Sequence, residues 1–117
     1  MLIRSFSTLL LVMTLLGGLG IRSVQAQSLL VPMDRQQQNH LRAYGLAYWT
    51  LEQEEKAEWL LNYRGGSFLL PDLPSVRREA AYRGVSITGV DAPAEARIRA
   101  TIEGANMEAV PLEQAPK

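Results

Sequence analysis

The sequence predicts an α/β fold on a mainly parallel sheet of the Rossmann or flavodoxin-like type, and three observations lead to this prediction. Apolar segments of strand length alternate with helical segments from residue 28 to residue 112. The first apolar segment, residues 28–33, has few polar positions, which is typical of a parallel strand buried on both faces. A strand, a helix and a second strand in this order form a β-α-β unit, whose strands are expected to be parallel.

The first half of the chain after residue 27 is expected to contain a strand, a long helix and a second strand. The first strand covers residues 28–33. Asp34 and Gln37 form a variant of the capping box, so we expect the helix over residues 35–53. Residues 57–63 are expected to form the second strand. One helix face carries apolar side chains at helical spacing and is expected to meet the core: Leu41, Tyr44, Tyr48 and Leu51, widened by Ala43, Leu46 and Ala47.

The second half continues the alternation of strands and helices. Pro74 in a first helical turn and Gly84 after a last turn predict a short helix over residues 75–83. The β-branched residues 85–90 predict a third strand. Asp91 is expected to cap a further helix that ends before Gly104, and residues 107–112 are expected to form a last extended strand.

Residues 1–26 have the features of an export signal, which leaves residues 27–117 as the α/β domain. Arg4 provides the positive start, residues 8–21 form an uncharged apolar stretch, and residues 23–26 offer small side chains for cleavage. We therefore expect an exported protein, periplasmic or extracellular, with no stable membrane span after signal removal. The alternative is an uncleaved anchor, although the apolar stretch is shorter than the about 20 residues of a membrane span.

Composition narrows the classes of function. Removing Arg4 and Arg22 with the signal leaves a small acidic excess and no basic patch, so no nucleic-acid partner is expected. The chain has no Cys and one His, so we expect no disulfide, no thiolate nucleophile, no metal site and no cofactor. The sequence predicts only four strands and a possible hairpin arm, fewer than doubly wound sheets usually have. We therefore predict that the chain is the N-terminal part of a longer parent chain, with a complete small domain as the alternative.

Two polar segments follow the first and second strands, where open α/β sheets bind ligands. Arg64 and the glycines after it could hold a small anionic ligand, but "YRGGS" also suits a hairpin turn between residues 57–63 and 67–71, and the turn is favoured. Asp34 suits a helix cap better than a catalyst, and His40 a partly buried side chain. Tyr44, Tyr48, Trp49 and Trp59 suit the core better than a stacking platform. The candidate ligand-binding residues are Asp34, Asn39, His40, Asn62, Tyr63, Arg64, Gly65, Gly66 and Ser67.

Two segments carry a resemblance to a known family. "LLVPMDRQQQNHLRAYGLAYWTLEQ" and "AEWLLNYRGGSFLLPD" resemble the N-terminal segment of exported bacterial proteins named as the asparagine synthetase B family. The resemblance covers nearly all of residues 27–117. It implies a parent several times longer, with a glutamine-amidotransferase-like α/β domain.

The resemblance does not carry over a catalytic residue. True asparagine synthetases use an N-terminal Cys to release ammonia and an "SGG-DS" loop to bind pyrophosphate, whereas this chain has no Cys and no Asp-Ser after its "RGGS". The sequence therefore predicts an exported fragment of an amidotransferase-like parent. The alternative is a non-enzymatic ligand-binding or interaction module of the cell envelope.

Overall fold

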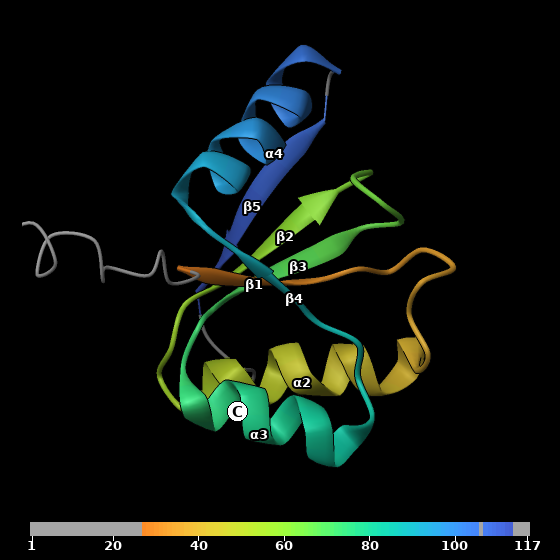
Figure 1. Cartoon of the computed structure of the whole chain (residues 1–117), viewed down its shortest axis with the longest axis vertical. Coiled ribbons are helices and arrows are strands. Elements are labelled where there is room, and N and C mark those ends of the chain that lie inside the picture. The colour runs from red at the N-terminus through yellow and green to blue at the C-terminus, as the bar shows by residue number, and fades with distance from the viewer. Residues whose placement is uncertain (1–26, 106, 114–117) are drawn as a thin grey trace, which may run out of the picture.

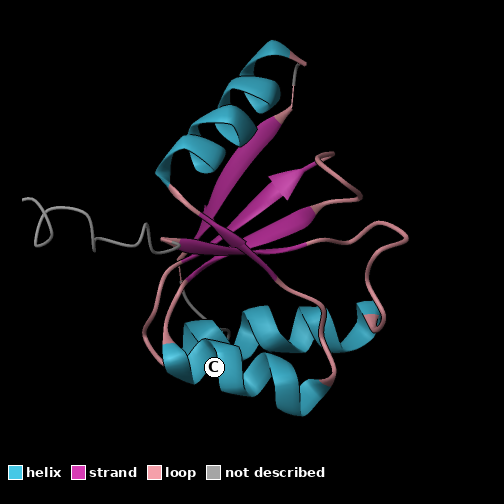
Figure 2. Ribbon diagram, viewed as in Figure 1, coloured by secondary structure: helices cyan, strands magenta, loops and turns pink. Residues whose placement is uncertain are grey.

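The computed structural model describes residues 27–105 and 107–113 and contains a five-stranded antiparallel sheet with helices on both faces (Figures 1 and 2). The strands lie in the order β4-β1-β3-β2-β5, and each is antiparallel to its neighbours. In chain order the elements are β1 (Ser28–Val31), α2 (His40–Glu52), β2 (Ala57–Leu61), β3 (Ser67–Pro71), α3 (Pro74–Arg83), β4 (Thr88–Val90), α4 (Ala92–Gly104) and β5 (Glu108–Leu112).

The predicted parallel Rossmann or flavodoxin-like sheet is wrong, and the reason lies in β3. This strand turns back after β2 and pairs with β2 on one side and β1 on the other. It therefore separates the two strands that were expected to be adjacent. β1 and β2 still run in the same direction, because both are antiparallel to β3. The first six elements follow the β-α-β-β-α-β order of ferredoxin-like folds, to which α4 and β5 are added.

The apolar strands that suggested a parallel sheet are explained by helices on both faces. Figure 1 shows α2 and α3 on one face of the sheet and α4 on the other. Alternate residues of β1 pack on the two faces of the sheet: Leu29 and Val31 join the cluster on the α2 and α3 side, and Leu30 joins the cluster on the α4 side. β3 is buried at four of its five positions for the same reason. An antiparallel sheet covered on both faces thus gives the same apolar runs as a parallel one.

Helix α2 begins later than predicted. It starts at His40, where the side chain of Asn39 accepts a hydrogen bond from the backbone N of Arg42 at 3.3 Å. Asp34 instead accepts from the backbone N of Gln36 at 3.0 Å, inside a turn. The buried amide of Gln37 donates to the carbonyls of Pro32 and Ser86, at 2.9 and 3.0 Å. The expected capping box is therefore wrong: its two side chains fasten the β1–α2 connection.

The face of α2 expected to meet the core is correct only in part. The buried positions are Ala43, Leu46, Ala47 and Thr50. Leu41 is 83% exposed, Tyr44 52% and Tyr48 42%. All three predicted additions to the face, Ala43, Leu46 and Ala47, belong to the core stripe. The helix therefore has apolar side chains on two sides, of which one meets the sheet.

Most of the second half agrees with the predictions. The hairpin reading of residues 57–71 is confirmed by the antiparallel pairing of β2 with β3. Gly84 ends α3 in the left-handed conformation at φ 65°, and the side chain of Asp91 accepts from the backbone N of Ala94 at 2.9 Å at the start of α4. The predicted strand over residues 85–90 is shorter, because pairing with β1 covers three residues only. Gly104 is the last residue of α4 rather than the residue after it.

The predicted export signal, residues 1–26, lies outside the described residues. Among the helices that are described, none is long and apolar enough to cross a bilayer.

Candidate functional site

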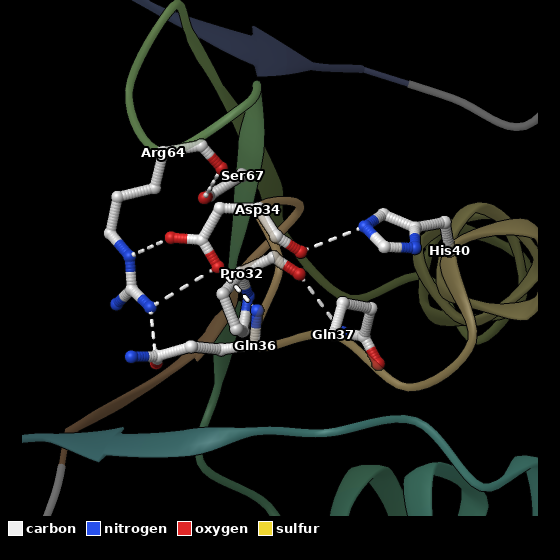
Figure 3. Close-up of polar contacts among 7 residues, drawn as sticks. All are labelled: Pro32, Asp34, Gln36, Gln37, His40, Arg64 and Ser67. Atoms are coloured by element: carbon white, nitrogen blue, oxygen red, sulfur yellow. Dashed lines mark hydrogen bonds and ion pairs between the residues drawn. The ribbon is translucent and has the colours of Figure 1, made fainter.

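The two predicted polar segments meet at one edge of the sheet. β1 and β2 run in the same direction, so the residues after them share an edge although β3 lies between them. Arg64 Nε donates to Asp34 Oδ2 at 2.7 Å, and Arg64 Nη2 donates to Gln36 Oε1 at 2.6 Å (Figure 3). We call Asp34, Gln36 and Arg64 the Asp34–Arg64 cluster. Two charged residues of the predicted site, Asp34 and Arg64, thus lie together. They bind each other, whereas they were expected to face a ligand.

The charges of the cluster balance internally. The hydrogen bond from Arg64 lowers the pKa of Asp34 below its ordinary value of 3.8, and the bond from the backbone N of Gln36 adds to this effect. Both charged side chains are about one-third exposed, at 28% for Arg64 and 33% for Asp34. Asp34 is therefore ionised at neutral pH and neutralises the cation that was expected to hold an anionic ligand.

The backbone of the "YRGGS" loop is also used within the protein. The backbone N atoms of Gly66 and Ser67 both donate to the carbonyl of Tyr63 at 3.0 Å. The carbonyl of Arg64 accepts from the backbone N of Met33 at 3.2 Å and from Ser67 Oγ at 3.1 Å. These bonds close the turn and connect it to Met33, just beyond the end of β1. The main structural role of the loop is therefore to connect the β2–β3 hairpin to the segment after β1.

The two glycines of this loop are required by close contacts. Gly65 has φ 82°, and a Cβ there would lie 2.5 Å from the carbonyl oxygen of Met33. Gly66 has φ 88°, and its carbonyl accepts from Trp59 Nε1 at 3.1 Å. A side chain at Gly65 would both clash and strain the backbone. The glycines thus allow the hairpin loop to lie close to Met33 and to the Trp59 side chain.

The other predicted site residues are spread around this edge. His40 Nε2 lies 2.8 Å from the carbonyl oxygen of Asp34, within hydrogen-bonding distance. Asn39 caps α2, as described above. Tyr63 packs against the cluster below α4, and Asn62 is exposed with φ 64°. Of the nine predicted residues, Tyr63 and Arg64 line one hollow beside α4.

An apolar groove lies beside α2 and was not expected from the sequence. Its volume is about 320 Å³, and Trp59 and Tyr44 both contact Phe68, with ring centroids 6.4 and 5.7 Å apart. Because Tyr44, Tyr48 and Trp59 remain exposed, the prediction that the aromatic residues belong to the core is wrong for these three, whereas Trp49 packs against the core. We call this surface the aromatic groove; its residues are Tyr44, Ala47, Tyr48, Leu51, Trp59, Phe68 and Leu112.

The sequence did contain a signal for the aromatic groove. Tyr44, Tyr48 and Leu51 stand at helical spacing, and that spacing was assigned to the core. Ala43, Leu46 and Ala47, which were predicted to widen that face, form the buried stripe together with Thr50. The side chains of α2 that are buried are therefore mostly smaller than the aromatic ones that remain exposed.

Comparisons with known proteins add no family. No family model, no curated protein and no solved structure matches this chain. The resemblance to the asparagine synthetase B family therefore remains a prediction.

The chemistry available at these sites is binding by burial and by charge. Within the described part of the chain, no three His, Asp or Glu side chains are placed to hold a metal ion. Asp34 is fixed as an ionised partner of Arg64 and orders the loop. The aromatic groove offers apolar area that a partner can cover, at roughly 25 cal/mol for each Å² buried.

Proposed function

We propose that this chain is a non-enzymatic binding module of the cell envelope, and that its aromatic groove binds an apolar segment of another polypeptide. The observation that carries this proposal is the second apolar stripe of α2. Leu41, Tyr44 and Tyr48 are exposed in spite of their size, and the stripe continues into the groove at Leu51. A helix that is apolar on two sides normally has a partner on each. Contiguous exposed apolar surface marks interaction sites in the same way.

The charges beside the groove indicate the chemistry of that partner. Glu52, Glu54 and Glu55 follow Leu51 at the end of α2 and are exposed. Glu113 follows Leu112, which lies opposite Ala57 at the same end of the sheet. Within residues 51–57 and 112–113, Lys56 is the one basic residue. We therefore propose that the partner segment is amphipathic, with aliphatic or aromatic side chains in the groove and basic side chains over this acidic end.

Trp59 allows the proposal to be tested by fluorescence, since it lines the groove. In a Trp49→Phe background, emission from Trp59 is measured while a synthetic amphipathic peptide with leucines, phenylalanines and terminal lysines is added. We expect a saturable change in emission, and affinity about tenfold weaker in Tyr44→Ser, a loss of about 1.4 kcal/mol. Tyr82→Ser is the matched control, because Tyr82 is equally large, is 84% exposed and lies on α3.

Three outcomes would count against this function. An unchanged Trp59 emission with the lysine peptide would remove the groove as a binding surface. Equal affinity for a peptide with glutamates in place of the lysines would remove the acidic end as a determinant. A dimer in sedimentation equilibrium that Tyr44→Ser dissociates would show that a second copy of the chain covers the groove.

Export and the longer parent are separate proposals. The apolar residues 8–21 and the small side chains of residues 23–26 support export with cleavage after Ala26. Mass spectrometry of the secreted chain tests this, and a chain that keeps Met1 would contradict it.

An amidotransferase-like parent is supported by the resemblance alone. The two segments that carry it contact each other in the fold, through Met33 and Arg64. The test is the coding sequence downstream of Lys117, which should continue in frame. Glutamine- or ammonia-dependent turnover by that longer protein, with ATP present, would show an amide-forming enzyme instead of a binding module.

A further inference from the structure

A second hollow lies on the opposite face of the sheet from the aromatic groove. It is bounded by α4, by the hairpin loop at Tyr63 and Arg64, and by the edge strand β4. Its volume is about 280 Å³, close to the lower end of the range of about 300 to 1,000 Å³ that is usual for small-molecule sites. We call it the α4 hollow. Its size suits a small metabolite and excludes a folded partner.

The lining of the α4 hollow combines an apolar floor with a cationic rim. Leu30, Val90 and Ile98 are buried side chains that form the apolar part. Arg97 and Thr101 line it from one side of α4, one helical turn apart. None of the ten lining residues is acidic. The hollow therefore favours a ligand with a short apolar body and a negative charge.

Arg97 is the cation that a ligand can reach. The other arginine at the rim, Arg64, already donates to Asp34, as described above. Arg99 on the same helix is likewise occupied, because it donates to Glu58 at 2.7 Å. In the described residues, the guanidinium of Arg97 has no hydrogen bond or ion pair, and its backbone carbonyl accepts from Thr101 Oγ1 at 2.9 Å. The hydroxyl proton of Thr101 is thus used internally, while its oxygen can still accept from a ligand.

We infer that the α4 hollow binds a small organic carboxylate, with Arg97 holding the carboxylate and the apolar floor covering its hydrocarbon body. A single guanidinium matches a single carboxylate, because its paired N–H groups fit the two oxygens side by side. A phosphate dianion would need a second free cation, and Arg64 is neutralised by Asp34. This site was not predicted from the sequence, since Arg97 and Thr101 are far from the hairpin loop along the chain and meet it only through the fold.

The test uses phenylpropionate as the probe and the amide NMR spectrum of the whole chain as the readout. We expect saturable shifts at residues 94–101 and at Tyr63, with weak affinity. Arg97→Gln should weaken binding about tenfold or more, since a charge-assisted pair is lost. Arg78→Gln is the control: it removes the same charge from an exposed position on α3 and should leave the affinity unchanged.

Two further probes make the inference falsifiable. Phenylpropanol has the same apolar body without the charge, and equal binding of it would overturn the role of Arg97. Inorganic phosphate has the charge without the body, and equal binding of it would overturn the carboxylate class. Unshifted amides at residues 94–101, or equal affinity of Arg97→Gln and the unsubstituted chain, would overturn the site itself. None of these outcomes depends on the aromatic groove, so this test and that of the proposed function fail independently.

Discussion

Contacts between single residues decide what the Asp34–Arg64 cluster does. Polar residues after β1 and β2 could be predicted to share one edge of the sheet, since each follows an apolar strand. Their mutual pairing could not be predicted, because it depends on a distance of 2.7 Å between residues 30 positions apart. A cation that would grip a ligand if it were free instead holds the turn beside β1. The same residue types thus serve as a site or as a contact, according to geometry alone.

The ionisation of Asp34 tests this contact directly. Its pKa is lowered in the folded protein, so ionised Asp34 stabilises the fold above the unfolded value, and this stabilisation is lost as pH falls through the folded pKa. In Arg64→Gln we expect the pKa of Asp34 to rise toward 3.8 and the acid dependence of stability to flatten. Carboxyl-carbon NMR titration measures the pKa, with Arg78→Gln as the charge-matched control. An Asp34 pKa that does not move in Arg64→Gln would contradict the ion pair.

Gly65 provides a second test at this scale. Gly65→Ala should destabilise the protein by at least about 2 kcal/mol, because it combines a left-handed backbone with a clash against the carbonyl of Met33. Gly104→Ala is the control, since no atom lies within 4 Å of a Cβ placed there. That change in a helix should be neutral or stabilising by up to about 1 kcal/mol. Urea denaturation measures both, and equal effects would argue against the tight turn.

At the scale of elements, the sequence predicted which helices form better than it predicted which face of a helix meets the sheet. The caps and prolines of α3 and α4 marked those helices, because capping depends on neighbouring residues only. The orientation of α2 depends on what packs against it. Two apolar stripes compete on this helix, and the stripe with smaller residues faces the sheet. Hydrophobic periodicity alone cannot decide between two such stripes.

A pair of leucines on α2 distinguishes the two stripes. Leu46 is fully buried, so Leu46→Ala should cost about 2 to 5 kcal/mol through lost contacts and a cavity. Leu41→Ala makes the same chemical change at a position 83% exposed, and should alter stability by no more than about 0.5 kcal/mol. Chemical denaturation compares the variants. A larger loss at Leu41 would mean that the originally predicted face meets the core.

For the whole molecule, the order of the strands was the feature that the sequence could not supply. The predicted strict alternation of strands and helices fails at β2 and β3, which follow each other directly, and this turns a parallel arrangement into a β-α-β-β-α-β fold. The difference is made by β3, which inserts between β1 and β2. Its burial at four of five positions is consistent with a central strand, whereas the sequence suggested only a hairpin arm. The chain was expected to be a fragment because it has fewer strands than a doubly wound parallel sheet. That comparison does not apply to this antiparallel sheet, and the longer parent chain remains a prediction.

Hydrogen exchange tests this strand order. Amides of the central strands β1 and β3 should exchange most slowly, through opening of the whole protein. Amides of β4 should exchange faster, because it lies at an edge and pairs over three residues only. Mass spectrometry of peptides covering residues 27–33, 67–71 and 86–91 gives the comparison. Protection in β4 equal to that in β3 would contradict the order β4-β1-β3-β2-β5.

The added strand β5 has a consequence for how the molecule behaves in a crowded solution. Without it, β2 would be an outer strand with no proline, and its regular row of backbone groups would invite other strands to join. β5 covers that row and carries Pro111, which has no amide hydrogen to offer to a newcomer. Within the described residues β5 is the outer strand on this side, and its proline disfavours the pairing of a further strand along this edge.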